Sequence, residues 1–186
     1  MRIYLAGPDV FLPDPWAAAA AKKAVCARFG AEGVFPMDPV HCPEADAAAE
    51  PFLAIYLRNE AHLRACDAVL ANLTPFRGPS ADAGTVYEVG FMRALGRRVA
   101  GYSNDPRPFA SRTLDFLGEQ VRRRADGSWE DAEGLHLENF DCHDNLMIDG
   151  GIRAAGGPFV ARAVPEAERW RDLVAFEAAL RLLLEG

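Results

Sequence analysis

Short apolar runs alternate along this chain with longer segments whose apolar positions recur at helical spacing. The first run, Ile3–Ala6, stops at Gly7-Pro8, and the longest run stops before a loop rich in glycine and proline. Apolar runs of this length with such boundaries are typical of buried strands. The pattern predicts strands at Ile3–Ala6, Val34-Phe35, Asp67–Leu73 and Arg97–Tyr102.

Helical segments fit between and after these strands. The clearest start is Asp14-Pro15, where a capping side chain precedes a proline suited to the first helical turn. Strands separated by helices form parallel sheets with right-handed crossovers. We therefore predict an α/β fold, a flavodoxin- or Rossmann-like open parallel sheet flanked by helices, as one domain over residues 1–186. The predicted helices are Pro15 to about Phe29, Pro51 to about Arg64, Ala83 to Leu95, and a terminal helix from Pro165 onward that includes Trp170 and Leu173.

The pattern weakens after Tyr102. Ser111–Leu117 fits a short helix, residues 125–128 fit a hairpin turn, and residues 138–158 contain few regular cues. The basic run at 122–124 is followed at once by acidic residues, which favours a solvated hairpin over a docking patch. Residues 103–140 could be a substrate lid or a peripheral segment, and the sequence does not choose between them.

Charge and termini exclude several classes of function. The net charge of -7 argues against nucleic-acid binding, which needs clustered Lys and Arg. The apolar run at the amino terminus is too short for a signal peptide or a membrane span, so we expect a cytoplasmic protein without membrane contact. The four cysteines have no CxxC spacing and are expected to be reduced thiols. His41-Cys42 and Cys142-His143 could be two halves of a zinc site, but neighbouring residues rarely chelate one metal, and no metal site is predicted.

One carboxylate falls on an apolar helix face. Phe91, Met92 and Leu95 stand three, four and seven positions after Glu88, so all four share one side of the predicted helix. Burial disfavours an ionised carboxylate unless it is paired, which makes a working site one interpretation. The other interpretation is an acidic residue in the first turn that complements the helix dipole.

The loops after the predicted strands supply further acidic groups. In an open parallel sheet these loops meet in one ligand crevice, so Asp9, Asp38, Asp82 and Asp105 are all expected to face it. No glycine-rich phosphate loop follows any strand, and this argues against a nicotinamide or ATP site. Acidic, neutral and aromatic groups suit a hydroxylated, uncharged ligand such as a nucleoside, and no cofactor is expected.

Several motifs together resemble the nucleoside 2-deoxyribosyltransferases. They occur in order and cover most of the chain to about residue 152, and they are most similar to the branch found in trypanosomatids and some bacteria. The motifs are YLAGP at 4–8, the aspartate of PMDPV, Asn59, the strand CDAVLANL, DAGTVYEVG and DNLM.

The resemblance implies roles for three residues. Enzymes of this family cleave the N-glycosidic bond of a 2'-deoxynucleoside, hold the sugar as a covalent ester and pass it to a second base. Glu88 would be the nucleophile, Tyr4 would hydrogen-bond and orient it, and Asp82 would grip the sugar hydroxyls. From the residues alone, Tyr4 could equally be an amphipathic strand residue and Asp82 a helix N-cap.

The resemblance also implies substrate-binding residues and a partner. Asn145 and Met147 match an Asn-x-Met that enters the neighbouring subunit's site in the family, so a homodimer or higher homo-oligomer with shared sites is expected. An ordinary loop with a buried methionine is the alternative. Gly7 belongs to the YLAGP motif of the site, while Asp38 and Phe11 are our candidates for contacting the base.

At Asn59 the sequence departs from the best-known family pattern. An aspartate credited with handling the leaving base falls here on an amide, which cannot deliver a proton. Water, Asp82, Asp38 or the incoming base must then protonate the leaving base, while Asp67, at the amino end of its strand, is expected to be structural. Two rival functions remain: an N-glycoside hydrolase acting on 2'-deoxynucleosides or their 5'-monophosphates, and a non-catalytic nucleotide-binding module.

Overall fold

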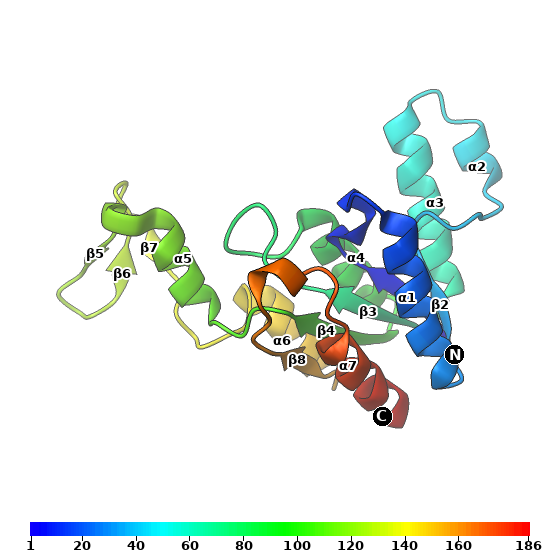
Figure 1. Ribbon diagram of the computed structural model, residues 1–186. Helices are drawn as coiled ribbons and strands as arrows, with labels where there is room; N and C mark the ends of the chain where they lie inside the picture. The colour runs from blue at the N-terminus through cyan, green and yellow to red at the C-terminus, as the bar shows by residue number, and fades with distance from the viewer.

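A parallel sheet of five strands forms the centre of the computed structural model, which describes residues 1–186 (Figure 1). Its order is β2-β1-β3-β4-β8. The predicted strands are confirmed with small shifts at their ends, while β8 was not predicted because it is a three-residue strand at the sheet edge. The strands are β1 (Arg2–Ala6), β2 (Glu32–Val34), β3 (Ala68–Asn72), β4 (Arg98–Ser103) and β8 (Phe159–Ala161).

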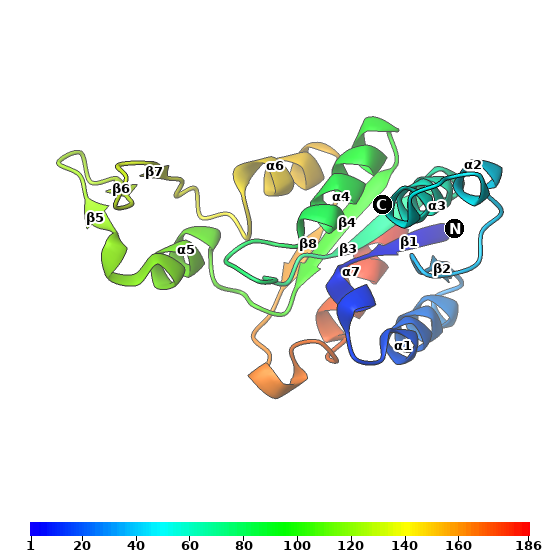
Figure 2. The ribbon, with the colours of Figure 1, turned by 90° about the horizontal axis from the view of Figure 1, so that it is seen from above.

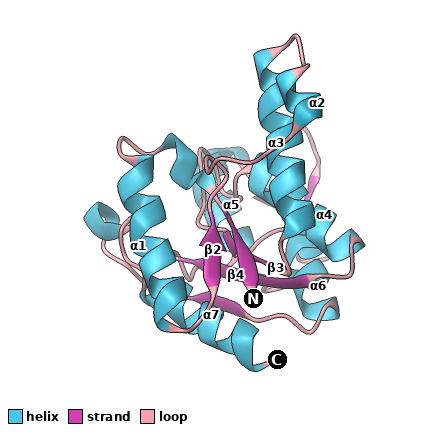
Figure 3. Ribbon diagram, turned by 90° about the vertical axis from the view of Figure 1, so that its right-hand side faces the viewer, coloured by secondary structure: helices cyan, strands magenta, loops and turns pink.

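Helices cover both faces of this sheet (Figure 3). On one face lie α1 (Pro15–Arg28) and α7 (Val174–Glu185), and on the other α3 (Pro51–Ala65), α4 (Ala83–Ala94) and α6 (Leu146–Ala154). Successive strand side chains point to opposite faces, so Ile3 and Leu5 pack in the α1 and α7 layer, whereas Tyr4 and Ala6 pack in the α3 and α4 layer. The predicted α/β fold with an open parallel sheet is thus confirmed.

Helix starts follow the capping signals of the sequence. The Asp14 carboxylate accepts a hydrogen bond from the Ala17 amide, and the Asp82 carboxylate accepts one from the Thr85 amide. The prediction that the apolar face of α4 is buried is correct for Met92, which is fully buried. It is wrong for Leu95, which is exposed. Leu95 follows the last helical residue and is exposed, because the helix ends before that position reaches the sheet.

The carboxyl-terminal helix is shorter than predicted. It begins at Val174, after the short 3-10 turn η3 (Glu166–Glu168), so Trp170 lies outside it. The buried Asn104 amide donates hydrogen bonds to the carbonyls of Arg169 and Asp172. These two bonds anchor the loop that precedes Val174 against the end of β4.

An arm formed by residues 109–137 projects from the body of the molecule (Figure 2). The predicted turn is confirmed, with Gly127 at a φ of 86° between β5 and β6. The predicted solvated hairpin is also confirmed, because Arg122 and Arg124 pair with Glu130. A third strand, β7, was not predicted. The arm contains α5 (Phe109–Leu117), η2 (Gly118–Gln120), β5 (Arg122–Arg123), β6 (Trp129–Glu130) and β7 (His136–Leu137).

Two short helical segments complete the fold. The 3-10 turn η1 (Pro8–Phe11) follows β1, and α2 (Pro43–Asp46) precedes α3. Neither was predicted, because four residues are too few for a helical period to register. No helix of the protein is both long enough and apolar enough to cross a membrane.

A fully buried carboxylate joins the arm to the body. Asp144 accepts hydrogen bonds from the Ser80 hydroxyl and the Ala81 amide, and its carboxylate lies 3.4 Å from the Arg112 guanidinium. Arg112 in turn donates to the carbonyls of Pro79 and His143. The loop that leads into α4 is therefore held by groups that sequence reasoning did not single out.

We expect Asp144→Ala to lower the free energy of unfolding by about 3–5 kcal/mol, because it leaves the buried Arg112 guanidinium without its carboxylate. Urea denaturation measures the loss. The matched control is Asp115→Ala, which breaks an ion pair between Arg107 and a carboxylate with 69% side-chain exposure and should cost less than about 1 kcal/mol. Equal losses in the two variants would contradict a structural role for Asp144.

Candidate active site

A cavity of about 500 Å³ opens at the carboxyl end of β1. Its walls come from the loop after β1, the loop after β2, the middle of α3 and the first turns of α4. This is where open α/β sheets bind their ligands. Six of the nine predicted site residues line it: Gly7, Phe11, Asp38, Asn59, Asp82 and Glu88.

Tyr4 and Glu88 meet beneath this cavity. The Tyr4 hydroxyl donates a hydrogen bond of 2.7 Å to Glu88 Oε1. Tyr4 is fully buried on β1, and Glu88 lies in the second turn of α4, so the contact joins the sheet to the helix that covers it. The predicted pairing of these two side chains is present, and it leaves Glu88 Oε2 as the carboxylate oxygen without a bond to Tyr4.

Burial dominates the electrostatics of Glu88. Desolvation raises the pKa of Glu88 from its ordinary value of 4.5 to about 7, the hydrogen bond from Tyr4 opposes this rise, and the negative charge of Asp82 adds to it. Burial beside this carboxylate also raises the pKa of Tyr4 far above the usual tyrosine range, so Tyr4 remains a hydrogen-bond donor. A carboxylate that titrates near neutrality inside a cavity is typical of a functional site.

Asp82 both caps α4 and lines the cavity, the two placements expected for it. Its Oδ2 caps α4 by accepting hydrogen bonds from the amide and the hydroxyl of Thr85. The same residue lines the cavity one and a half helical turns before Glu88. The capping contacts fix the orientation of this carboxylate, so it presents a preoriented acceptor to a ligand.

Gly7 lets the loop after β1 approach β3 closely. A side chain at this position would place its Cβ 2.5 Å from Asp9 Oδ2 and 2.7 Å from the Cβ of Asn72. Only glycine fits such spacing without a shift of the neighbouring groups. This close approach sets the position of the loop that carries Phe11.

Phe11 stands at the mouth of the cavity. Its side chain is 56% exposed, and its ring stacks on Phe76 with a centroid distance of 5.5 Å. The Arg77 guanidinium lies over both rings. The predicted aromatic group is therefore present where a flat ligand could contact it.

Asp38 lines the cavity, but its carboxylate is occupied by the protein itself. Oδ1 pairs with the Lys23 ammonium and Oδ2 accepts a hydrogen bond from the Phe35 amide. The buried His62 ring contacts the Asp38 carbonyl at 3.0 Å. This arrangement differs from the expected bonding to a base edge and favours a role in holding the loop after β2.

Asn59 belongs to a face of α3 that turns toward the cavity. Ile55, Arg58 and Asn59 all line it, and His62 continues the same face. Sequence reasoning singled out Asn59 alone and missed Arg58. Arg58 and Asn59 stand three and four residues after Ile55, and this spacing places all three on one face of a helix. Arg58 pairs with Asp46 at an exposed position, which leaves its guanidinium only weakly held.

Asn145 and Met147 lie outside this cavity in the single chain. The Asn145 side chain caps α6 by accepting a hydrogen bond from the Met147 amide and donates to Glu138. Met147 is 75% exposed. The alternative of a loop with a buried methionine is therefore wrong on both counts, since the segment opens a helix and the methionine faces solvent.

Two of the four loop aspartates do not face the cavity. Asp9 is buried against Lys22 at 2.6 Å, and Asp105 forms a salt bridge of 2.6 Å with Arg107. Each carboxylate is paired with a cation, Lys22 of α1 for Asp9 and Arg107 of the same loop for Asp105, because a buried charge is stabilised by an opposite charge. Asp67 behaves as expected of a structural residue, since it accepts a hydrogen bond from the Arg2 amide at the start of β1.

Fold and site together define an α/β protein of the flavodoxin-like type with a carboxylate of raised pKa in the crevice beyond its strands. A family model described as nucleoside 2-deoxyribosyltransferase matches residues 3–147, and the chain belongs to this family. The predicted resemblance is confirmed.

Three individual proteins are similar to this chain. An uncharacterized protein of Schizosaccharomyces pombe is 33% identical over 182 residues, which cover 92% of this chain and 86% of that protein. The structure of a 2-desoxiribosyltransferase from Leishmania mexicana is 33% identical with a TM-score of 0.57, covering 79% of this chain and 84% of that one. A conserved protein of Enterococcus faecalis shares the fold at 20% identity and a TM-score of 0.56, over 100% of this chain and 98% of that one.

The raised pKa of Glu88 predicts a pH-dependent cost to stability. The native state holds this proton up to pH about 7 and the unfolded chain only to about 4.5, so the free energy of unfolding falls as pH rises through this window. Relative to the wild type, Glu88→Gln should gain roughly 2–3 kcal/mol between about pH 4 and about pH 8.5. Denaturant titration of both proteins across this range measures the gain.

Glu177→Gln is the matched control on the surface of α7. The pKa of Glu177 is lowered by hydrogen bonding to Arg181, so this replacement should show no relative gain in stability above about pH 5. A pH-independent difference between Glu88→Gln and the wild type would rule out the raised pKa.

Proposed function

We propose that this protein transfers 2-deoxyribose between nucleobases through a covalent ester on Glu88. The observation that carries the proposal is the 2.7 Å hydrogen bond from Tyr4 to Glu88 at the base of the cavity. Membership of the nucleoside 2-deoxyribosyltransferase family supports the choice of a 2'-deoxynucleoside as donor and a free nucleobase as acceptor. Neither half-reaction calls for a cofactor.

In the first half-reaction the Glu88 carboxylate attacks C1' of the sugar. A bond forms between its free oxygen and C1' while the bond from C1' to the base nitrogen breaks, and the electron pair leaves with the base. Tyr4 holds the other oxygen, which restricts the carboxylate to one orientation. Asp82, fixed by Thr85, is placed to accept hydrogen bonds from the sugar hydroxyls.

In the second half-reaction an incoming base takes the place of the first. Its nitrogen attacks C1', the ester bond to Glu88 breaks, and the carboxylate is regenerated. The base stands between Phe11 and the face of α3 that carries Asn59 and Arg58. Phe11 offers a stacking surface, whereas Asn59 and Arg58 offer hydrogen bonds to the edge of the base.

The leaving base must gain a proton, and the candidate donors are now fewer. Both Asp38 carboxylate oxygens are already engaged, by the Lys23 ammonium and the Phe35 amide, and the Asn59 amide cannot deliver a proton. Water and Asp82 remain, because the incoming base takes its place only after the first base has left.

Hydrolysis of a 2'-deoxynucleoside or its 5'-monophosphate is the alternative. Arg58 in the cavity and Arg77 over Phe11 provide the cations that a phosphate would need. Against this, Asp82 points a negative charge at the sugar end, and the nearby Ser80 hydroxyl is already bonded to Asp144. These contacts favour an unphosphorylated nucleoside.

Trapping the ester tests the nucleophile. After acid quenching of a reaction with deoxyinosine, mass spectrometry should find one deoxyribosyl group on the peptide containing Glu88. Glu88→Ala should lose the adduct and lower base release by on the order of 10³-fold or more, while Glu177→Gln should retain both. An active wild type with no adduct, or an adduct on another residue, would remove Glu88 from this role.

Acceptor dependence separates transfer from hydrolysis in the same assay. With transfer, adenine should be required for rapid release of hypoxanthine and should appear as deoxyadenosine. A release rate that is the same with and without adenine supports the hydrolase instead. A wild type that binds deoxyinosine without any turnover would point to the non-catalytic binding module.

The proposal includes a second copy of the chain that completes the site. Met147 and Phe140 are 75% and 65% exposed at one end of the body, and Phe52 and Tyr87 are 73% and 48% exposed beside the Glu88 cavity. Apolar surfaces of this kind favour association between copies. In such a homodimer or higher homo-oligomer, Asn145 and Met147 would enter the cavity of a neighbouring copy, as the family resemblance implies.

Co-expression of two defective variants tests the shared site. Glu88→Ala and Met147→Ala should each have low activity, and the co-expressed population should regain about a quarter of the wild-type rate, because about half of the dimers are then mixed and each mixed dimer has one of its two sites intact. Met147→Ala avoids the helix cap made by Asn145 and should fold normally. Activity that only averages the two separate variants would contradict a composite site.

A further inference from the structure

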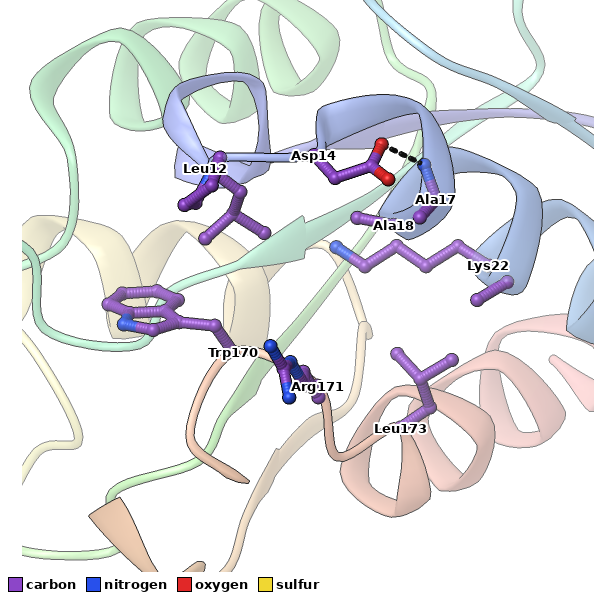
Figure 4. Close-up of a pocket in the computed structure, with 10 residues that line it drawn as sticks. Leu12, Asp14, Ala17, Ala18, Lys22, Trp170, Arg171 and Leu173 are labelled. Carbon is purple, nitrogen blue, oxygen red and sulfur yellow. Dashed lines mark hydrogen bonds between the residues drawn. The ribbon is translucent and has the colours of Figure 1, made fainter. Parts of the chain in front are cut away.

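A second cavity, of about 390 Å³, lies between α1 and the loop that precedes α7 (Figure 4). It is separated from the Glu88 cavity by the loop after β1. Gly7, Val10 and Phe11 of this loop face the Glu88 cavity, whereas Leu12 and Pro13 face the second cavity. The volume falls in the range of small-molecule sites, and the proposed reaction does not use this cavity.

The walls of the second cavity are apolar except at a few places. Small alanines on α1 create the space, and Leu12 and Leu173 close two of its sides. Trp170 stands at one end as a broad aromatic surface and is only partly buried. An indole beside an open, apolar space offers a stacking surface to a flat ring system.

The polar groups of the second cavity sum to no net charge. Lys22 extends from α1 into the site, where its buried ammonium is offset by Asp9 at 2.6 Å. At the opening, Asp14 uses one carboxylate oxygen to cap α1 and has the other free. Arg171 pairs with no carboxylate, although its neighbours Arg169 and Asp172 are paired with Glu166 and Arg162.

We propose that the second cavity binds an uncharged planar heterocycle whose edge carries both hydrogen-bond donors and acceptors, as a free nucleobase does. The ring stacks on Trp170, an acceptor atom on its edge meets the Arg171 guanidinium, and a donor meets the Asp14 carboxylate. Because Asp14 and Arg171 carry opposite charges, they give the cavity no net attraction for a charged ligand.

Aromatic contacts connect this site with the mouth of the Glu88 cavity. Trp170 meets Phe76 edge to face at 6.1 Å, and Phe76 stacks on Phe11 at 5.5 Å. Trp170 therefore lies two ring contacts from Phe11, and a ligand stacked on Trp170 also touches the reverse side of the loop that carries Phe11. The binding proposal itself rests on the second cavity alone and does not depend on the proposed transfer reaction.

Fluorine NMR of protein labelled with fluorotryptophan tests this binding. The chain has three tryptophans, so Trp170→Phe identifies the Trp170 resonance by its disappearance. Hypoxanthine or adenine, titrated into the low millimolar range, should shift the Trp170 resonance to saturation. The resonance of Trp129, on β6 in the projecting arm, should stay in place.

Two variants locate the binding. Ala18→Phe fills the second cavity and should abolish the shift of Trp170, while unchanged Trp16 and Trp129 resonances report an intact fold. Arg171→Ala removes one hydrogen bond without filling the space and should weaken binding several-fold. Saturation that persists unchanged in Ala18→Phe would place the ligand elsewhere, including the Glu88 cavity, and a Trp170 resonance that never shifts in the wild type would overturn the proposal.

Discussion

The hydrogen bond between Tyr4 and Glu88 is the contact on which the site depends, because it holds a carboxylate in a place that disfavours its charge. Burial raises the pKa of Glu88 to about 7, and Asp82 adds to the rise. Without the Tyr4 hydroxyl the carboxylate would lose the one group that opposes both effects. The contact also joins β1 to α4, so the position of the helix against the sheet and the chemistry of the cavity depend on the same two atoms.

The other aspartates around the site divide into two groups by their partners. Asp82 faces the cavity, as Glu88 does, and remains open to a ligand. Asp9, Asp38 and Asp144 instead use their carboxylates to hold the loop after β1, the loop after β2 and the loop before α4. Each of these three pairs with a cation from another segment. Loops held by such contacts around a desolvated carboxylate fit the requirements of a preorganised site.

The sequence was informative wherever local chemistry decided the outcome. Asp14-Pro15 marked the start of α1, and Asp82 marked the start of α4. The apolar runs of β1, β3 and β4 identified the buried strands of the sheet. Regions with weak local preferences were misjudged: α6, interrupted by Gly150-Gly151, and β8, with three residues at the sheet edge, showed no readable period.

The residues that line the Glu88 cavity were largely readable from the sequence, because family motifs and strand ends both pointed to the same loops. Whether a carboxylate in those loops faces a ligand or a lysine was not readable. That choice depends on which cation a distant segment brings near: Lys22 and Lys23 are neighbours on α1, yet one is buried with Asp9 and the other pairs with Asp38. The second cavity is likewise a product of tertiary structure alone, since Trp170 lies in the loop that Asn104 anchors and its indole forms a wall of the cavity. The sequence by itself determined most of the elements and the acidic nucleophile candidate, because these rest on short-range patterns. Only the tertiary structure decided the partners of each charge, because they come from segments far apart in the chain.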